Sequence, residues 1–318
     1  MKKRIITALI LGFILIPAAL VPALFEVFQV LLILFSLIAA AELVNMYDNE
    51  KKLSLPVKCV SIVLTFVLYC SIINSFEQCN DSLIIKMLAL TNMDKFLSPI
   101  IVLISIFIIL MSMLVFDKNL DAKDIGKLFM SIIYVSIGAG AFTVLRFFGV
   151  RFMVYVLIMA MITDIFALVF GLTMGKHKMA PHISPKKTWE GALGGTLVAT
   201  IVGVLFLYFY PEISHFFHDE GDIDFFFNIF NYDIFTTHGK IIFVIMLSIS
   251  LSICGQIGDL VASKLKRAYG IKDYSNIFPG HGGVMDRFDS TFFASAIFLI
   301  FMLIESNLFP FVLWKIYI

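Results

Sequence analysis

Long apolar segments recur along the whole chain, and they constrain its fold more than any other feature of the sequence. A helix needs about 20 mostly apolar residues to cross the hydrocarbon layer of a bilayer. The segments that meet this requirement are residues 5–24, 28–47, 57–73, 99–116, 128–145, 152–174, 189–210, 241–262 and 290–309. Only 15% of the 318 residues are charged and the mean hydropathy is +0.97, a composition that excludes an ordinary soluble domain. We therefore predict an all-α, polytopic integral membrane protein with about nine transmembrane helices.

Positive charges are distributed unevenly among the connections between these segments. If the N-terminus lies in the cytoplasm, eighteen Lys and Arg residues fall in cytoplasmic connections and six on the other side. Cytoplasmic connections of membrane proteins carry such an excess. The sequence thus predicts a cytoplasmic N-terminus. We expect one membrane domain, with N-terminal transmembrane helices in residues 1–150 and a cytoplasm-facing catalytic site carried by the helices of residues 151–318. No basic domain or tail is set apart, so nucleic acid is not an expected partner.

Residues 263–289 form a polar stretch between two apolar segments. They hold four glycines, and glycines let a backbone approach a bulky ligand closely. The cationic side chains of the stretch suit phosphate groups. These cations are Lys264, Lys266, Arg267, Lys272 and Arg287. Carboxylates among the cations, Asp273, Asp286 and Asp289, favour a phosphate that is held through a metal ion.

Three carboxylates near the cytoplasmic ends of the last two segments could bind a divalent cation. Asp259 and Ser263 are four residues apart and share a helical face, and Asp286 and Asp289 are three residues apart. Carboxylate oxygens are the ligands that Mg²⁺ prefers, which makes Asp259, Asp286 and Asp289 candidate metal ligands. A purely structural role for Asp259 stays open.

Two acidic residues lie inside apolar segments. A carboxylate within a membrane span costs roughly 2.5 to 3.5 kcal/mol on insertion scales, so such residues usually have a function. Asp164 either faces a ligand or forms a hydrogen bond to a neighbouring helix. Glu42 either belongs to a polar cavity or forms a hydrogen bond that packs two helices.

The loop at residues 175–191 carries four lysines ahead of an expected helix. The first two lysines can be explained by the cytoplasmic excess of positive charge alone. Ser184, Lys186 and Lys187 differ, because a proline stiffens the chain where hydroxyl and ammonium groups meet and because helix starts favour anions. We predict that Lys186 or Lys187 contacts phosphate.

A histidine lies in the glycine-rich turn of the polar stretch. His281, followed by Gly282 and Gly283, could donate to phosphate or carry a proton. A lone histidine could equally have no chemical role.

Two of these stretches resemble those of one enzyme family. SKLKRAYGIKDYSNIFPGHGGVMDRFD, residues 263–289, is similar to the signature of phosphatidate cytidylyltransferases, also called CDP-diacylglycerol synthases, and GKHKMAPHISPKKTWEG, residues 175–191, resembles a second stretch typical of that family. The resemblance implies a multi-pass nucleotidyltransferase of phospholipid biosynthesis, commonly a homodimer, in a bacterial-type inner (plasma) membrane. Such an enzyme makes CDP-diacylglycerol and pyrophosphate from CTP and phosphatidate, a membrane lipid, with Mg²⁺ and with K⁺ as a second cation.

The resemblance also implies roles by position. The implied catalytic residues are Asp164, Asp259, Lys266, Arg267, Asp286 and Asp289. The implied substrate-binding residues are Ser184, Lys186, Lys187, Ser263, Lys272, Asp273, His281, Gly282, Gly283 and Arg287. The sequence departs from the family pattern at Ile165, Phe166, Leu168, Leu172 and Ala262.

The implied reaction is an in-line attack of the phosphatidate phosphate on the α-phosphorus of CTP. It depends on positioning and charge neutralisation and needs no covalent nucleophile. The alternative is a transporter of an anionic lipid or nucleotide, which usually has polar sites near mid-membrane and repeat symmetry. Here the polar residues gather towards one face and no repeat is evident. The sequence also lacks a P-loop motif and the DGxxAR run of CDP-alcohol phosphotransferases.

Overall fold

The computed structural model describes residues 13, 15–76, 79–80, 82–92, 96–217, 237–280 and 282–308. Helices dominate this part of the chain, and its one sheet is a two-stranded hairpin. The chain divides into two compact units. Unit 1 comprises Met1–Phe148 and Leu265–Phe288, and unit 2 comprises Gly149–Lys264 and Asp289–Ile318.

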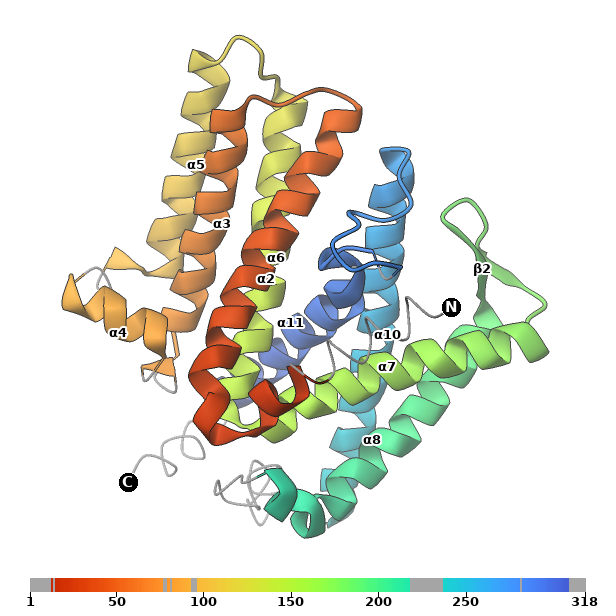
Figure 1. Cartoon of the computed structure of the whole chain (residues 1–318). Helices are drawn as coiled ribbons and strands as arrows, with labels where there is room; N and C mark the ends of the chain where they lie inside the picture. Colours follow the sequence, from red (N-terminus) through yellow and green to blue (C-terminus); the bar gives the residue numbers. More distant parts are fainter. Residues whose placement is uncertain are drawn as a thin grey trace. The chain divides into compact units, whose positions relative to one another are not determined.

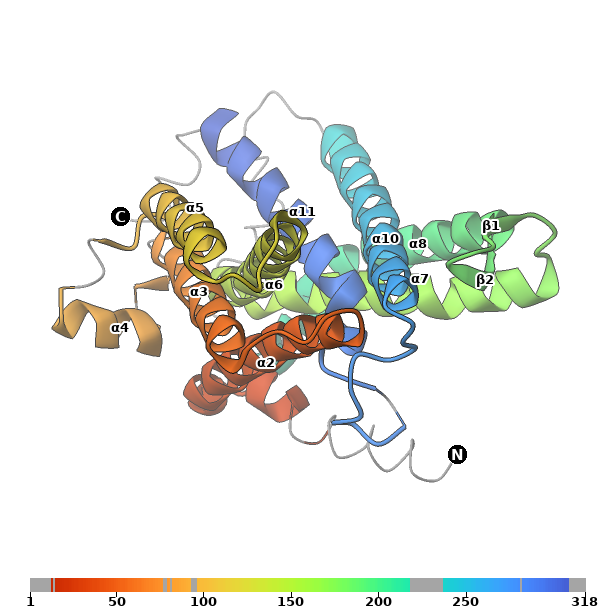
Figure 2. The same ribbon diagram turned by 90° about the horizontal axis from the view of Figure 1, so that it is seen from above.

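Unit 1 contains long helices that lie alongside one another (Figure 1). Its elements in chain order are η1 (Pro22–Leu24), α2 (Phe25–Met46), η2 (Tyr47–Asn49), α3 (Leu55–Asn74), α4 (Leu83–Leu90), α5 (Pro99–Phe116) and α6 (Ala122–Phe148). Helices α2, α3 and α6 pack against one another, and α5 packs against α3 and α6. Figure 2 shows α3 between α2 and α5. A proline is the second residue of α3 and the first residue of α5, and its fixed φ suits the first turn of a helix.

Buried hydroxyl groups connect the helices of unit 1. Tyr47 Oη and Ser131 Oγ are 2.7 Å apart, and Tyr69 Oη and Thr143 Oγ1 are 2.9 Å apart. Lipid provides no hydrophobic drive for helices to associate, so close packing and such hydrogen bonds stabilise the bundle, each bond by about 0.6 kcal/mol.

Unit 2 is built on α7 (Val150–Thr173) and α8 (Trp189–Phe217), which lie side by side with a hairpin at one end of both (Figures 1 and 2). The hairpin pairs β1 (Lys178–Ala180) antiparallel with β2 (Ser184–Thr188). Glycines let the two helices approach closely. A Cβ added at Gly195 would lie 2.7 Å from Thr163 O of α7, so no larger residue fits there without a shift.

Two helices contain residues of both units. Helix α10 (Thr237–Ala268) passes from unit 2 to unit 1 after Lys264, and α11 (Met285–Leu308) passes from unit 1 to unit 2 after Phe288.

Seven helical segments in the described residues are long and apolar enough to cross a membrane. They are Phe25–Asn49, Leu55–Asn74, Pro99–Phe116, Ala122–Phe148, Val150–Thr173, Trp189–Phe209 and Ile242–Ala268. Each overlaps a predicted segment, so the prediction of an all-α, multi-pass membrane protein is confirmed. The predicted span at residues 290–309 falls on α11, which is not among the seven. Residues 5–12 and 14 of the first predicted span lie outside the described residues, so the count of nine and the cytoplasmic N-terminus stay predictions.

Candidate active site

Thr188 anchors the end of the hairpin in a socket formed by glycines of unit 2. Its side chain is buried, and its Oγ1 accepts a hydrogen bond from the Gly191 N–H at 3.1 Å, which caps the first turn of α8. A Cβ added at Gly175 would lie 2.7 Å from Thr188 Oγ1, and one at Gly191 would lie 2.9 Å from it. The glycines therefore leave room for Thr188, which fixes β2 against α7 and α8.

Glu190, in the first turn of α8, holds the other side of the same loop. Its carboxylate accepts hydrogen bonds from the backbone N–H groups of Lys176 at 3.1 Å and His177 at 3.2 Å. The His177 ring contributes a further contact, 2.6 Å between Nδ1 and Glu190 Oε1. A carboxylate in the first turn of a helix is also favoured by the helix dipole. The loop that carries the predicted phosphate-binding lysines is thus tied down at both ends.

The hairpin places Lys187 against Asp259 of α10, and the two side chains form an ion pair. Lys187 Nζ is buried and makes no well-directed hydrogen bond, so the contact is electrostatic. The Ser263 hydroxyl lies 3.4 Å from Asp259 Oδ1, one turn further along the helix. The side chain of Lys187 is 24% exposed and that of Asp259 is 27% exposed, but the ammonium nitrogen itself is buried, so a phosphate could reach it only if the lysine side chain moved away from Asp259. We call this pair the unit 2 cluster.

Helices α10 and α11 nearly touch beside Asp259. A Cβ added at Gly258 would lie 2.6 Å from Asp289 O and 2.9 Å from Phe293 Cβ. Asp289 is 7% exposed, and its Oδ1 accepts a hydrogen bond from the Ser290 N–H at 2.8 Å. The predicted ligands Asp259 and Asp289 therefore lie on helices that are in close contact.

Asp286 of α11 is surrounded by hydrogen-bond donors from unit 1. Its Oδ1 accepts from Lys266 Nζ at 2.6 Å, and its Oδ2 accepts from the backbone N–H groups of Tyr274 at 2.8 Å and Gly283 at 2.9 Å. The side chain of Asp286 is 3% exposed, and that of Lys266 is 12% exposed. A carboxylate and an ammonium group buried this deeply are tolerated because they are paired and hydrogen-bonded. We call this pair, with the loop around it, the unit 1 cluster.

Glu42 of α2 lies against the same loop. Its Oε1 accepts from Ser275 Oγ at 2.5 Å and from the Val284 N–H at 3.0 Å, and its Oε2 accepts from the Met285 N–H at 2.8 Å. Of the two interpretations left open by the sequence, packing through hydrogen bonds is the one that these contacts support.

The other predicted site residues are more exposed. In unit 1, Arg267, Lys272, Asp273 and Arg287 are exposed, and Arg267 Nη1 donates to Ile271 O at 3.1 Å. In unit 2, Lys186 and Asp164 are exposed, whereas Ser184 is half-buried. The buried Gly282 has a φ of +84°, a conformation that favours glycine. His281 lies outside the described residues.

The carboxylates suit a divalent cation in their chemistry. Within the described residues, no group of three or more His, Cys, Asp or Glu side chains is arranged to hold a metal ion. Asp259 and Asp286 each contact a lysine ammonium instead. An ammonium group beside a carboxylate marks where a cation is favourable, and the donors are the hard oxygens that Mg²⁺ prefers. A metal ion would have to displace these ammonium groups or share the carboxylates with them.

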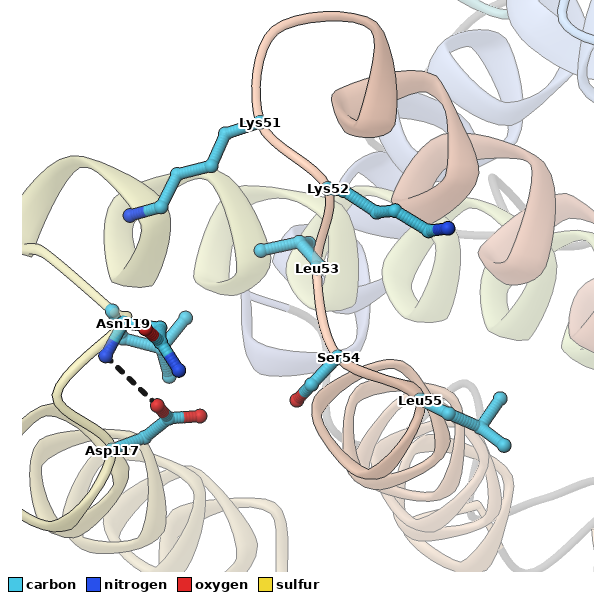
Figure 3. A pocket seen from close by; sticks show the side chains of 8 residues that line it. Lys51, Lys52, Leu53, Ser54, Leu55, Asp117 and Asn119 are labelled. Atoms are coloured by element: carbon cyan, nitrogen blue, oxygen red, sulfur yellow. Dashed lines mark hydrogen bonds between the residues drawn. The ribbon is translucent and has the colours of Figure 1, made fainter.

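Two pockets elsewhere lack the features of a nucleotide site. A pocket of about 430 Å³ in unit 1 lies between the α2–α3 and α5–α6 connections, and Figure 3 shows its residues Lys51 and Lys52 pointing in different directions. Lys51 pairs with Asp124 at 2.5 Å, and this contact raises the pKa of the lysine. A groove of about 600 Å³ in unit 2, along α8 and α10, is lined without any charged side chain, so it could not neutralise a triphosphate.

Comparison with known proteins decides the family. The pattern of the cytidylyltransferase family matches residues 2–305 of the chain. The chain belongs to the cytidylyltransferase family. Phosphatidate cytidylyltransferase of Staphylococcus haemolyticus (strain JCSC1435) is 39% identical over 192 residues, which are 60% of this chain and 64% of the relative. The relatives of the same name from Staphylococcus epidermidis (strain RP62A) and Staphylococcus aureus (strain COL) are 32% identical over 293 residues, 92% of this chain and 95% of theirs.

The family resemblance carried by residues 175–191 and 263–289 is thereby confirmed. The sequence left Glu42 undecided, named Thr188 only as one of two hydroxyls at a helix start that favours anions, and gave no role to Glu190. A signal for the last two was present, since Thr188 directly precedes an apolar run and Glu190 falls in its first turn, as in helix caps. No comparable local signal exists for the contacts of Glu42, because its partners are distant in the sequence.

Proposed function

We propose that this family member is a phosphatidate cytidylyltransferase, which makes CDP-diacylglycerol and pyrophosphate from CTP and phosphatidate. The observation that carries the proposal is the family match across residues 2–305, together with relatives of that name that align over 92% of the chain. Two buried or half-buried carboxylate–lysine pairs support it, because cationic groups are what a triphosphate and a lipid phosphate require.

In the proposed reaction, an oxygen of the phosphatidate phosphate attacks the α-phosphorus of CTP. A P–O bond to that oxygen forms as the bond to the β-phosphate bridging oxygen breaks, and pyrophosphate leaves with the electron pair. The ammonium groups of Lys187 and Lys266 bind and orient the phosphates, exchanging a carboxylate partner for a phosphate. Catalysis then depends on position and charge neutralisation.

We propose Mg²⁺ as the cofactor, with Asp259, Asp286 and Asp289 as its ligands. When bound, the metal would neutralise charge on the phosphate oxygens. A second cation, K⁺, is proposed on the family resemblance alone.

The remaining proposals concern the setting of the enzyme. We propose an active site on the cytoplasmic face of the bacterial inner membrane, because most Lys and Arg residues fall in the connections of that side. We also propose a homodimer, on the family resemblance alone.

Labelled CTP, phosphatidate vesicles and Mg²⁺ incubated with the purified protein test the function, and a labelled CDP-lipid is the expected product. Asp259→Asn should lower turnover at least about 100-fold, because it removes a charge that organises the reacting phosphates. The matched control is Asp121→Asn. Asp121 caps the start of α6 by accepting from the Asp124 N–H at 2.9 Å, outside both clusters, and Asn caps a helix about as well as Asp.

Two outcomes would contradict the proposal. Movement of lipid or nucleotide across the membrane without consumption of CTP would indicate a transporter. Full activity of Asp259→Asn at normal expression would remove Asp259 from the site.

A further inference from the structure

Glu42 is a nearly buried carboxylate inside the apolar helix α2. Its residue is 4% exposed, and its neighbour Leu43 is completely buried. A carboxylate in such surroundings is costly unless hydrogen bonds compensate it. The Ser275 hydroxyl and the N–H groups of Val284 and Met285 supply that compensation.

The partners of Glu42 lie where α11 begins. The first N–H groups of a helix have no partner within the helix and usually need a capping side chain. The residue just before α11 is Val284, which has no side-chain oxygen to supply a cap. Glu42 reaches from α2 and accepts from Val284 and Met285 instead, and a negative group is favoured at this end of a helix.

The same few residues hold Asp286. The Gly283 N–H donates to Asp286 Oδ2, while the next two N–H groups donate to Glu42. A Cβ added at Gly283 would lie 2.3 Å from Glu42 Oε1, and one added at Gly282 would lie 2.7 Å from Asp286 Oδ2. Both carboxylates therefore lie against one short piece of backbone, and movement of that backbone would move Asp286 and its partner Lys266.

We propose that Glu42 is a positioning residue for cytidylyl transfer. It fixes the backbone of residues 283–285 by capping α11, and thereby holds the Asp286–Lys266 pair in one geometry without contacting the substrates. The inference rests on the proposed function and adds a residue from α2, outside the two stretches that carry the family resemblance.

Glu42→Gln tests the proposal, because the amide keeps the size of the side chain but offers only one acceptor oxygen to two backbone N–H groups. We expect kcat to fall about 100-fold, as for a reacting group displaced by about 1 Å, with little change in the KM for CTP. Glu42→Asp keeps the charge and should recover part of the loss. Hydrogen exchange of the full-length protein should show faster exchange at residues 283–285 in Glu42→Gln.

Gln29→Met is the matched control. Gln29, also on α2 and 5% exposed, accepts from the Leu83 N–H at 2.8 Å, so it too satisfies the start of another helix, α4. Its loss should lower the melting temperature without lowering kcat at a temperature where the protein is folded.

The outcomes separate this inference from the proposed function. An active wild type with an unchanged kcat in Glu42→Gln, or with equal losses of kcat in Glu42→Gln and Gln29→Met, would overturn the inference alone. If Glu42→Gln does not fold, Ser275→Ala replaces it. That variant removes one hydrogen bond to Glu42 and should lower kcat more than Gln29→Met, and an unchanged kcat would overturn the inference. Absence of any CDP-lipid from the wild type would overturn both proposals.

Discussion

Glycines, which have no side chain, shape the surroundings of both clusters. Around Thr188, Gly175 and Gly191 leave the space that the threonine side chain fills, and around Asp286, Gly282 and Gly283 let the backbone meet two carboxylates. Backbone N–H groups then serve as fixed donors, with no side-chain entropy to lose. The charged groups are thus held by contacts that leave little room even for a methyl group.

Gly191→Ala should destabilise the protein by about 1 to 3 kcal/mol, the usual cost of overpacking. The new Cβ would lie 2.5 Å from Ala167 O and 2.9 Å from Thr188 Oγ1, and a backbone oxygen cannot move aside easily. The melting temperature in detergent measures the effect. Gly126→Ala in α6 is the control, because nothing lies within 4 Å of its added Cβ. It should stabilise the helix by roughly 0.5 to 1 kcal/mol. Equal melting temperatures for the two variants would refute the glycine socket.

Among the elements, the β1–β2 hairpin depends most on contacts outside itself. Two short strands are at best marginally stable in isolation. Thr188 joins the hairpin to the start of α8, and Glu190 holds the chain just before β1. This two-sided attachment is what gives Lys187 a defined position against Asp259.

Glu190→Ala should therefore weaken CTP binding. Loss of the hydrogen bonds to Lys176 and His177 frees one side of the hairpin, and we expect the KM for CTP to rise roughly fivefold, equivalent to about 1 kcal/mol. Steady-state kinetics measure it. Glu50→Ala is the control, because Glu50 is a glutamate of the same size that forms an ion pair with Lys127 at 2.9 Å, outside both clusters. A KM that is unchanged in Glu190→Ala would show that the hairpin does not contribute to nucleotide binding.

The helices could be predicted because their length and apolarity are local properties of the sequence. Pro99–Phe116 begins and ends at the predicted residues. The hairpin was not predicted, since β2 has five residues with a proline among them, too few for an alternating pattern. Partners such as Lys187 for Asp259, or Glu42 for Val284, are distant in the sequence and meet only through packing. The sequence could therefore nominate charged residues but could not pair them.

At the scale of the whole molecule, each unit is discontinuous in the sequence. Unit 1 takes Leu265–Phe288 from late in the chain, and unit 2 resumes at Asp289. A cut near residue 148 would leave unit 1 without Lys266, Tyr274 and Asp286, so its cluster needs both parts of the chain.

The proposed orientation can be tested by labelling with a membrane-impermeant maleimide in a variant without the native cysteines. His182→Cys, in the exposed turn of the hairpin, should react only after the cells are permeabilised, because the proposed orientation, which follows the excess of positive charge, has this turn in the cytoplasm. Lys86→Cys, exposed on α4, should react in intact cells. Reaction of His182→Cys in intact cells would reverse the proposed topology. Should Cys79 have to be retained, it adds little background, because burial raises the pKa of its thiol to about 12.

The cap that Glu42 places on α11 also has a consequence for biosynthesis. A ribosome makes α2 long before it makes Val284 and Met285, so the carboxylate enters the membrane with none of its backbone partners yet translated. The early helices must therefore be inserted while the Glu42 carboxylate still lacks the Val284 and Met285 N–H groups, which are translated much later. Premature termination before residue 284 would leave it permanently without those partners, a defect that quality-control proteases of the membrane could recognise.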